Sequence, residues 1–335
     1  MSDTKFKALV VNEVEKGIFH REIRERRIED LPSGNVLVRV YYSSLNYKDA
    51  LSASGNKGVT RKYPHTPGID AAGIVEDSQT SLFKPGDKVI VTSYDLGMNT
   101  SGGFSGFIRV PDSWVVPLPE KLSLRQSMMF GTAGFTAGLS AYKLINSGIS
   151  PESGEILVTG ATGGVGSIAV SILNQGGFSV CAVNGFSDES DYLLSLGAKS
   201  VISIEEASAG NAPLLKERWA GCIDTVGGNI LANAVKSTKQ NGAVTCCGNA
   251  ASHELPLNVY PFILRGVSLI GIDSQQCPMP LRKKVWDAIA EKWNHHKINE
   301  FVSEIPLELL SEKIDLMLSG RNRGRTIVNL NQDLI

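Results

Sequence analysis

The hydrophobic pattern divides the chain into three blocks. In the first block, up to about residue 125, short apolar runs are separated by turns rich in proline and glycine, a pattern typical of β-strands. The strand-like runs cover residues 36–42, 73–76 and 87–91. Because these strands are short and their turns irregular, the pattern predicts a small barrel or sandwich.

The second block, about 126–270, alternates apolar strand-like runs with helical periodicity. The predicted strands cover residues 156–159, 180–183, 201–204, 222–225, 243–247 and 267–271. A helix can be placed between most neighbouring pairs. Regular alternation of this kind predicts a doubly wound parallel sheet of the α/β class.

The third block begins with a predicted helix over 284–292 and continues with a second helix over 307–319. It ends in a predicted strand at 326–330, which lies far along the chain from the central sheet. We therefore expect this strand to return to the first domain. The predicted architecture is a β-rich domain, 1–125 with 285–335, and a Rossmann nucleotide-binding domain, 126–284.

A glycine-rich turn at 160–166 follows the first strand of the second block and leads into a helix. Glycines let the backbone approach a pyrophosphate closely, and a helix N-terminus offers free N–H groups and a positive dipole end. The turn therefore predicts a dinucleotide site, with Thr162, Gly163, Gly164 and Val165 as cofactor contacts. About 150 residues precede it, which is why another domain must come first.

Composition narrows the class further. The 335 residues include 33 basic and 34 acidic residues, with a net charge of −1, which gives no support for a nucleic-acid or membrane partner. The N-terminus lacks the apolar core of a signal peptide, and no stretch is long and apolar enough to span a membrane. The five cysteines form no CxxC pair, as expected in a reducing compartment. We expect a soluble cytoplasmic protein.

Several motifs, in order along the chain, resemble those of the medium-chain dehydrogenase/reductase superfamily. They are the segments 67–73, 84–89, 131–137 and 324–328. Three further segments, 44–49, 262–267 and 271–274, resemble its acrylyl-CoA reductase/quinone oxidoreductase branch of the YhdH/YhfP type. The resemblance covers nearly the whole chain and implies a GroES-like first domain, a Rossmann second domain and a nicotinamide cofactor.

Zinc members of this superfamily need cysteine and histidine ligands, and this chain lacks them. The histidine of their Gly-His-Glu turn is replaced here by Ile69, and no cysteine precedes Cys181. His20 and His65 have no matching carboxylate or thiolate ligands in sequence. We therefore expect a metal-free reductase.

Without zinc, another group must handle the developing charge and the proton. A carbonyl-conjugated double bond accepts hydride at its β-carbon, which leaves an enolate that needs stabilisation and a proton. Tyr47, flanked by Asn46 and Lys48, is the candidate catalytic residue; it either donates this proton or lines the pocket and contacts the cofactor. Asp49 and Asp70 are further candidate carboxylates, although Asp70 in a Pro-Gly turn suits a structural role.

The choice of cofactor depends on the end of the second Rossmann strand. NAD enzymes usually place an acid there, whereas Asn184, Gly185 and Phe186 follow this strand. The missing acid predicts NADPH, although no basic residue stands at this point to neutralise its 2′-phosphate. The resemblance implies that Tyr192 and Arg325 approach that phosphate. Leu269 completes the predicted set of cofactor-binding residues.

Two further features leave alternatives open. Arg265 suits either an anionic substrate group, such as a CoA phosphate, or a structural role capping carbonyls. The strand at 267–271 resembles one that joins sheets across a two-fold axis, which predicts a homodimer.

The leading functional prediction is NADPH-dependent reduction of an activated C=C bond in an enoyl-CoA, an enone or a similar substrate, with acrylyl-CoA the most specific suggestion. A quinone reductase is the alternative among enzymes. A zeta-crystallin-like nucleotide-binding protein without activity is the alternative outside enzymes.

Overall fold

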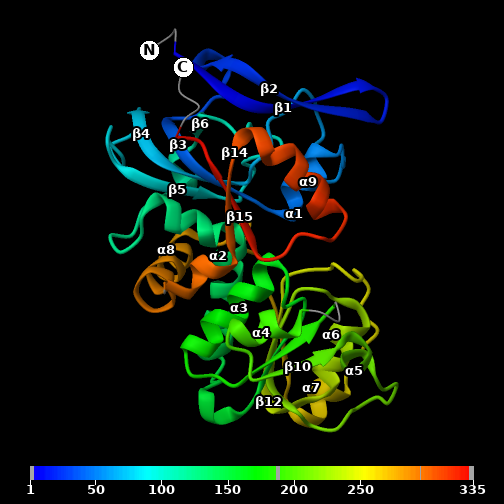
Figure 1. The fold of residues 1–335 in the computed structure, drawn as a ribbon. Coiled ribbons are helices and arrows are strands. Elements are labelled where there is room, and N and C mark those ends of the chain that lie inside the picture. Colours follow the sequence, from blue (N-terminus) through cyan, green and yellow to red (C-terminus); the bar gives the residue numbers. More distant parts are fainter. Residues whose placement is uncertain (1–3, 186–188, 295, 332–335) are drawn as a thin grey trace. The chain divides into compact units, whose positions relative to one another are not determined.

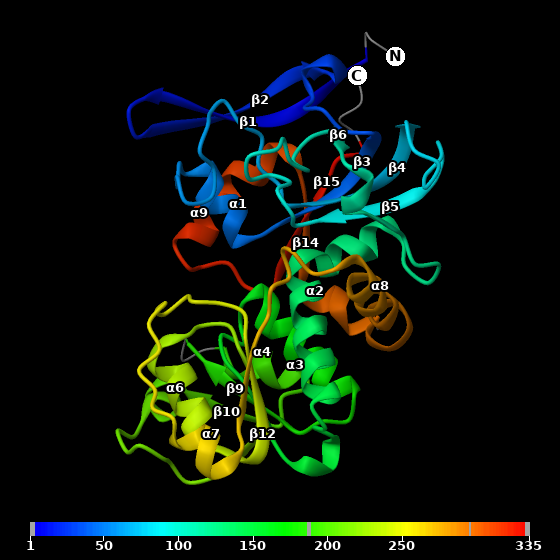
Figure 2. The same ribbon diagram turned by 180° about the vertical axis from the view of Figure 1, so that it is seen from behind.

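The structure is a computed structural model that describes residues 4–185, 189–294 and 296–331 (Figures 1 and 2). The chain forms two compact units. Unit 1 consists of Met1–Thr132, Gln275–Lys283 and Asn299–Ile335, and unit 2 of Ala133–Ser274 and Lys284–Ile298. The predicted domain limits at 125/126 and 284/285 stay a prediction, because compact units need not coincide with independently folding domains.

Unit 1 is built on a seven-stranded sheet in the order β14-β15-β3-β4-β5-β7, with β6 paired to β3. These strands are β3 (Val36–Leu45), β4 (Asp70–Ser78), β5 (Lys88–Thr92), β6 (Phe107–Val110), β7 (Val115–Pro117), β14 (Val302–Pro306) and β15 (Arg325–Asn329). The predicted return of the final strand is confirmed, since β15 pairs antiparallel with β3 through Thr326↔Leu45 and Val328↔Ser43.

A long hairpin, β1 (Lys5–Glu15) and β2 (Ile18–Arg27), begins unit 1 and forms a two-stranded sheet of its own (Figure 1). The sequence pattern did not predict it. Most β2 side chains are charged and exposed or half-buried, so the strand shows little of the apolar alternation that marks a half-buried strand. β1 is buried only in its first half.

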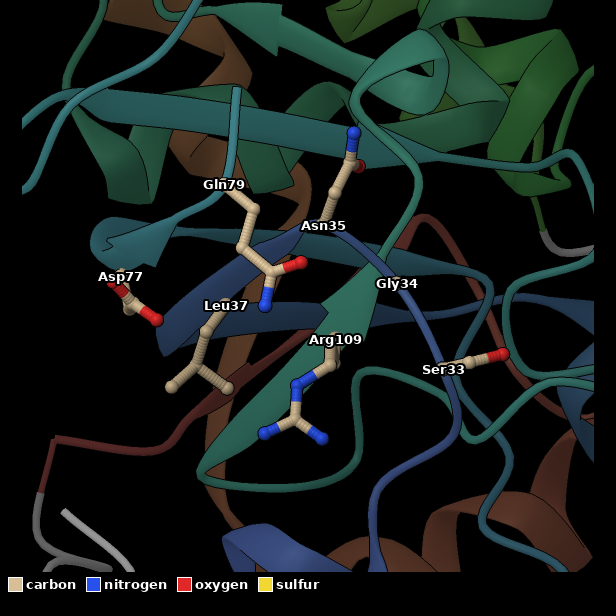
Figure 3. Close-up of a pocket in the computed structure, with 7 residues that line it drawn as sticks. All are labelled: Ser33, Gly34, Asn35, Leu37, Asp77, Gln79 and Arg109. Atoms are coloured by element: carbon tan, nitrogen blue, oxygen red, sulfur yellow. The ribbon is translucent and has the colours of Figure 1, made fainter. Parts of the chain in front are cut away.

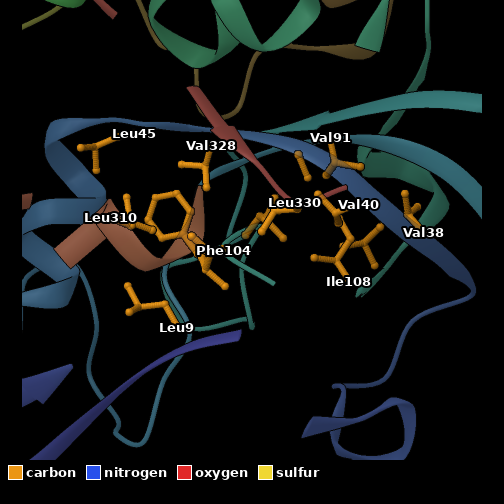
Figure 4. Packing of buried hydrophobic residues seen from close by; sticks show 14 of the residues in the cluster. Leu9, Val38, Val40, Leu45, Val91, Phe104, Ile108, Leu310, Val328 and Leu330 are labelled. Carbon is orange, nitrogen blue, oxygen red and sulfur yellow. The ribbon is translucent and has the colours of Figure 1, made fainter. Parts of the chain in front are cut away.

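The core of unit 1 joins segments from both ends of the chain (Figure 4). Leu9 of β1 and Val40 of β3 belong to the same buried cluster as Val328 of β15 and Leu310 of α9 (Leu310–Leu318). α9 packs against α1 (Tyr47–Ala53), the short helix that follows β3. The start of α1 is therefore fixed by a core that is complete only when the C-terminal segment is in place.

Unit 2 contains a six-stranded parallel sheet in the order β10-β9-β8-β11-β12-β13, which confirms the predicted Rossmann-type sheet. The strands are β8 (Ile156–Val158), β9 (Val180–Asn184), β10 (Ser200–Ser203), β11 (Trp219–Asp224), β12 (Thr238–Cys246) and β13 (Ser268–Gly271). The chain runs outward from β8 to β10 and then returns to β11, so the strand order reverses between β8 and β11.

Helices connect the strands of unit 2. They are α3 (Gly164–Gln175), α4 (Ser190–Ser195), α5 (Ile204–Ser208), α6 (Gly228–Lys236) and α7 (Tyr260–Arg265). Along the chain, α2 (Leu124–Asn146) and α8 (Met279–Ala288) each contain a boundary between the units.

Six short 3-10 or π helices complete the helical elements among the described residues. They are η1 (Ile28–Asp30), η2 (Asp112–Trp114), η3 (Pro151–Ser153), the π-helix η4 (Ile289–Trp293), η5 (His296–Phe301) and η6 (Leu307–Leu309). The helix predicted over 284–292 is thus divided between α8 and η4, and the one predicted over 307–319 between η6 and α9. Within the described part of the chain, no helix has the length and apolar character needed to cross a bilayer.

Candidate active site

The glycine turn of unit 2 has the backbone that the sequence predicts for a phosphate cradle. Gly160 has φ of +58°, and a Cβ there would collide with the side chain of Thr225. A Cβ at Gly166 would collide with the carbonyl oxygen of Gly160 and lie 2.7 Å from the Cα of Ala161. Both positions therefore require glycine.

The turn leads directly into α3. Gly163 is its N-cap and makes no side-chain cap, so no capping side chain occupies the N–H groups of the first turn. Thr162, Gly164 and Val165 are half-buried and Gly163 is exposed, which leaves this end of α3 accessible. These residues fit the pyrophosphate of a dinucleotide.

The other predicted cofactor residues of unit 2 are spread across its sheet. Asn184 ends β9, is 8% exposed, and donates from its Nδ2 to Ser190 Oγ at 3.3 Å. Gly185 is exposed, Phe186 lies outside the described residues, and Tyr192 is half-buried on α4. Leu269 lies on β13, at the edge of the sheet and separated from β8 by two strands. Their contacts with a cofactor stay a prediction.

Tyr47 is the first residue of α1 in unit 1, and its side chain is 58% exposed. Asn46 is the N-cap of the helix and forms a capping box with Asp49. The Oδ2 of Asp49 accepts hydrogen bonds from the backbone N–H of Asn46 at 2.8 Å and from Asn46 Nδ2 at 3.3 Å. The backbone of Tyr47 is thereby fixed at its start, while its phenol is presented to solvent.

Asp70 is fully buried beneath this helix start and collects hydrogen bonds from three segments of unit 1. Its Oδ2 accepts from Ser44 Oγ at 2.5 Å and from Asn46 Nδ2 at 2.7 Å. Its Oδ1 accepts from Thr132 Oγ1 at 2.5 Å, and the backbone N–H of Thr132 donates to the same carboxylate. A buried carboxylate with this many donors is stabilised in its position, in agreement with the structural role predicted for the turn.

Asp49 is also fully buried, and it connects the start of α1 to the Pro-Gly turn. Its Oδ1 accepts from the backbone N–H of Gly68 at 3.1 Å and of Ile69 at 2.8 Å. Burial, with a smaller contribution from the charge of Asp70, raises the pKa of Asp49 to about 7, although its hydrogen bonds from backbone N–H groups act in the opposite direction. This helix start therefore lies over two carboxylates held close together.

Arg325, at the start of β15, supplies the positive charge of this buried cluster and is 2% exposed. Its Nη1 donates to the carbonyl of Leu45 at 3.2 Å and to Asn46 Oδ1 at 3.1 Å, and its Nη2 donates to Ser44 Oγ at 2.7 Å. Its Nη2 also lies 3.9 Å from Asp70 Oδ2. This burial favours a structural role over the predicted contact with a 2′-phosphate, which stays a prediction.

Gly131 makes room for the cluster by interrupting α2 with φ of +53°. A Cβ at Gly131 would lie 2.5 Å from Asp70 Oδ2 and 2.8 Å from Arg325 Nη2. Neither α2 nor this interruption was predicted from the sequence.

The residues of unit 1 that the structure describes do not fit a catalytic zinc ion. Ile69 is apolar and 3% exposed. The side chain of Asn46 is hydrogen-bonded to Asp49, Asp70 and Arg325. His65 is 8% exposed with its Nε2 2.9 Å from the carbonyl oxygen of Gly97, and burial lowers its pKa. His20 lies on the exposed strand β2. These donors form no tetrahedral set of the kind that zinc requires.

Two other features, one in each unit, are also candidate sites. Arg265 donates to the backbone carbonyls of Lys236 at 2.8 Å and Leu215 at 2.7 Å, which favours the structural alternative for this residue. A pocket of about 380 Å³ lies beside β3, β4 and β6 of the seven-stranded sheet of unit 1 (Figure 3). Leu37 of β3 lies between Asp77 of β4 and Arg109 of β6 there.

Comparison with known proteins identifies the family of this chain. Residues 32–120 match the alcohol dehydrogenase GroES-like domain, and residues 164–291 match the zinc-binding dehydrogenase family. The chain is 47% identical over 304 residues to the putative quinone oxidoreductase YhfP of Bacillus subtilis, covering 90% of this chain and 92% of that protein. It is 43% identical over 328 residues to the acrylyl-CoA reductase AcuI of Ruegeria pomeroyi, covering 97% and 99%.

Solved structures show the same similarity. The YhdH oxidoreductase of Salmonella enterica in complex with NADP matches with a TM-score of 0.94 and 40% identity, covering 96% of this chain and 99% of that chain. YhfP of Bacillus subtilis with NAD bound matches with a TM-score of 0.95 and 44% identity, covering 98% and 100%.

The chain belongs to the medium-chain dehydrogenase/reductase family of oxidoreductases, within its acrylyl-CoA reductase/quinone oxidoreductase branch. The predicted family, the GroES-like and Rossmann fold class and the prediction of an enzyme are confirmed.

Proposed function

We propose that this protein is an NADPH-dependent reductase of a carbonyl-conjugated C=C bond, with acrylyl-CoA or a similar enoyl thioester as its substrate. The observation that carries the proposal is the similarity to AcuI over 97% of this chain, together with a glycine turn that fits a dinucleotide. The complex of YhdH with NADP supports the choice of cofactor. When bound, NADPH supplies a hydride. The protein must position the substrate, stabilise the enolate and supply its proton.

In the proposed site, the turn at Thr162, Gly163, Gly164 and Val165 holds the pyrophosphate. Asn184, which ends β9, and Gly185, which follows it, lie toward the ribose that carries the 2′-phosphate. Asn184 carries no negative charge, so it does not repel a phosphate. Tyr47 provides a hydroxyl donor for the substrate oxygen or for the proton that completes the reduction.

The experiment is an assay of NADPH oxidation by the full chain with acrylyl-CoA, crotonyl-CoA and a panel of 1,4-quinones, repeated with NADH. We expect the highest kcat/KM with an enoyl-CoA and NADPH. Activity with quinones alone would instead support a quinone reductase. The similarity to YhfP, which is named a putative quinone oxidoreductase, favours this alternative. Tight binding of NADPH without any turnover would support the zeta-crystallin-like binding protein, and a clear preference for NADH would refute the choice of cofactor.

The first prediction concerns Tyr47. Tyr47→Phe removes only the hydroxyl, so we expect kcat to fall at least about tenfold, while the dissociation constant of NADPH changes little. Fluorescence titration of NADPH and steady-state kinetics measure the two quantities separately. Tyr42→Phe, a half-buried tyrosine of β3, is a matched control that should leave kcat unchanged. An unaltered kcat in Tyr47→Phe would leave Tyr47 with a lining role only.

We also propose that the protein is a homodimer in the cytoplasm, with the exposed edge of unit 2 as its interface. β13 is an edge strand of the parallel sheet, and the preceding α7 exposes Ile263 by 67% and Leu264 by 62%. Val259 and Tyr260 extend this apolar surface. An open strand edge beside exposed apolar side chains is suited to pairing with a second copy.

The second prediction tests this interface. Ile263→Lys places a charge in the apolar surface, so we expect it to shift the mass measured by light scattering from twice 36.0 kDa toward the monomer. Leu82→Lys is the control, because Leu82 is 70% exposed in unit 1, far along the chain from β13. A wild-type protein that is monomeric at all concentrations would contradict the proposal.

A further inference from the structure

Thr159 and Asp224 occupy the point in unit 2 where the strand order reverses. Thr159 follows the last residue of β8, and Asp224 is the last residue of the neighbouring strand β11. β8 and β11 pair in parallel through Ile156↔Gly221 and Val158↔Ile223. In doubly wound sheets the ligand lies outside the carboxyl ends of the strands at this reversal. Both residues are completely buried there.

The two side chains bond to each other and to the backbone of the turn after β11. Thr159 Oγ1 donates to Asp224 Oδ1 at 2.7 Å and accepts from the backbone N–H of Thr225 at 3.0 Å. Asp224 Oδ2 accepts from the backbone N–H of Gly227 at 2.9 Å. A single hydroxyl and a single carboxylate thus connect the glycine turn after β8 with the turn after β11.

Both turns contain a glycine in the left-handed region. Gly160, which directly follows Thr159, has φ of +58°, and Gly227, whose N–H donates to Asp224, has φ of +73°. The hydroxyl of Thr225 donates to the carbonyl oxygen of Thr159 at 2.9 Å and fills the space that a Cβ at Gly160 would take. The two turns therefore pack on each other at Gly160 and Thr225.

Charge strengthens the connection. Asp224 carries a carboxylate in a site from which water is excluded, and burial raises its pKa while its hydrogen bonds from Thr159 and from backbone N–H groups lower it. If the hydroxyl of Thr159 is lost, one carboxylate oxygen remains buried without that donor, which costs more than the loss of an exposed hydrogen bond.

We propose that Thr159 and Asp224 are positioning residues that hold the glycine turn at 160–166 in the shape that receives the pyrophosphate of NADPH. Neither residue touches the cofactor in this role; Thr159 directly precedes Gly160, and Asp224 holds Thr159 and the backbone of Gly227. The inference rests on the proposed function, because it assigns the turn to NADPH.

The test compares two substitutions at one position. Thr159→Val keeps the shape of the side chain and removes the hydroxyl, whereas Thr159→Ser keeps the hydroxyl and removes a methyl group. We expect Thr159→Val to raise the dissociation constant of NADPH at least about tenfold, the equivalent of about 1.4 kcal/mol. We expect Thr159→Ser to stay within about threefold of the wild type, since it retains both hydrogen bonds.

A second ligand separates positioning from a general loss of structure. 2′-AMP carries the 2′-phosphate and the adenosine of NADPH but lacks the pyrophosphate. Its inhibition constant should be the same in wild type and Thr159→Val, whereas NADPH binding is weakened. Equal weakening of both ligands, or a lower melting temperature with unchanged NADPH affinity, would show that Thr159 is only structural and overturn the proposal.

Asp224→Asn provides an independent variant if Thr159→Val does not fold. The amide keeps one acceptor oxygen but loses the charge, so NADPH binding should again weaken while 2′-AMP binding is retained. NADPH binding equal to wild type in this variant would also overturn the proposal. If the wild-type protein binds no NADPH, the proposed function itself is refuted. If the wild type binds NADPH and Thr159→Val binds it equally well, only the positioning role is refuted.

Discussion

Replacing Arg325 by alanine is expected to lower the free energy of unfolding by about 3–5 kcal/mol, the usual cost of removing one partner from a buried ion pair. The substitution leaves the buried carboxylate of Asp70 without its nearest positive charge. It also removes the donors to the carbonyl of Leu45 and to Asn46 Oδ1. Chemical denaturation followed by circular dichroism measures this change in the transition that reports on unit 1.

Two variants make this third prediction specific. Arg323→Ala removes an exposed arginine two residues earlier and should change the free energy of unfolding by less than about 0.5 kcal/mol. Arg325→Lys keeps the charge but not the fork of donors, so we expect an intermediate loss. If Arg325→Ala is as stable as Arg323→Ala, the buried cluster does not hold unit 1 together as described.

Gly166→Ala is expected to weaken NADPH binding at least about 100-fold, or about 2.7 kcal/mol. The added Cβ would collide with the carbonyl oxygen of Gly160 and approach the Cα of Ala161. Both are backbone atoms, so relief requires the whole glycine turn to move. Titration of NADPH with the variant measures the loss.

The control for this fourth prediction is Gly271→Ala on β13. A Cβ at Gly271 meets no atom within 4 Å, and its φ is not in the left-handed region. NADPH affinity in this variant should equal that of the wild type. Equal affinity in Gly166→Ala as well would mean that the turn does not bind the cofactor.

The sequence predicted unit 2 well because its signals are local. Each strand of the parallel sheet contains an apolar run, and each is followed by a helix or turn within a few residues, so pattern alone locates it. The largest difference is at β12, which begins at Thr238 with polar residues, whereas the predicted strand begins at residue 243. The β1–β2 hairpin was missed because the side chains of β2 are mostly charged. β2 pairs only with β1, so its sequence lacks the apolar pattern of a buried strand.

The buried clusters could not be predicted because their partners are distant in sequence. Arg325 and Asn46 are separated by 279 positions, and Thr159 and Asp224 by 65. The family resemblance implied that Arg325 approaches a phosphate. In the structure its guanidinium donates to the carbonyls of Met129 and Leu45 and to Ser44 Oγ, all in unit 1. Thr159 carries no signal at all, because a threonine at the end of a strand is ordinary. Tyr47, Asn46 and Asp49 were recognised because they are adjacent in one motif.

The pairing of β15 with β3 also affects how the protein is made. A ribosome releases β3 early, but β15 emerges only after all of unit 2 has been synthesised. Until then the 42–45 edge of β3 lacks its neighbour, and Asp70 and Asn46 lack the guanidinium that bonds to them. An unpaired strand edge is prone to join other chains. A frameshift before Arg325 would therefore remove β15 and leave this edge of β3 unpaired.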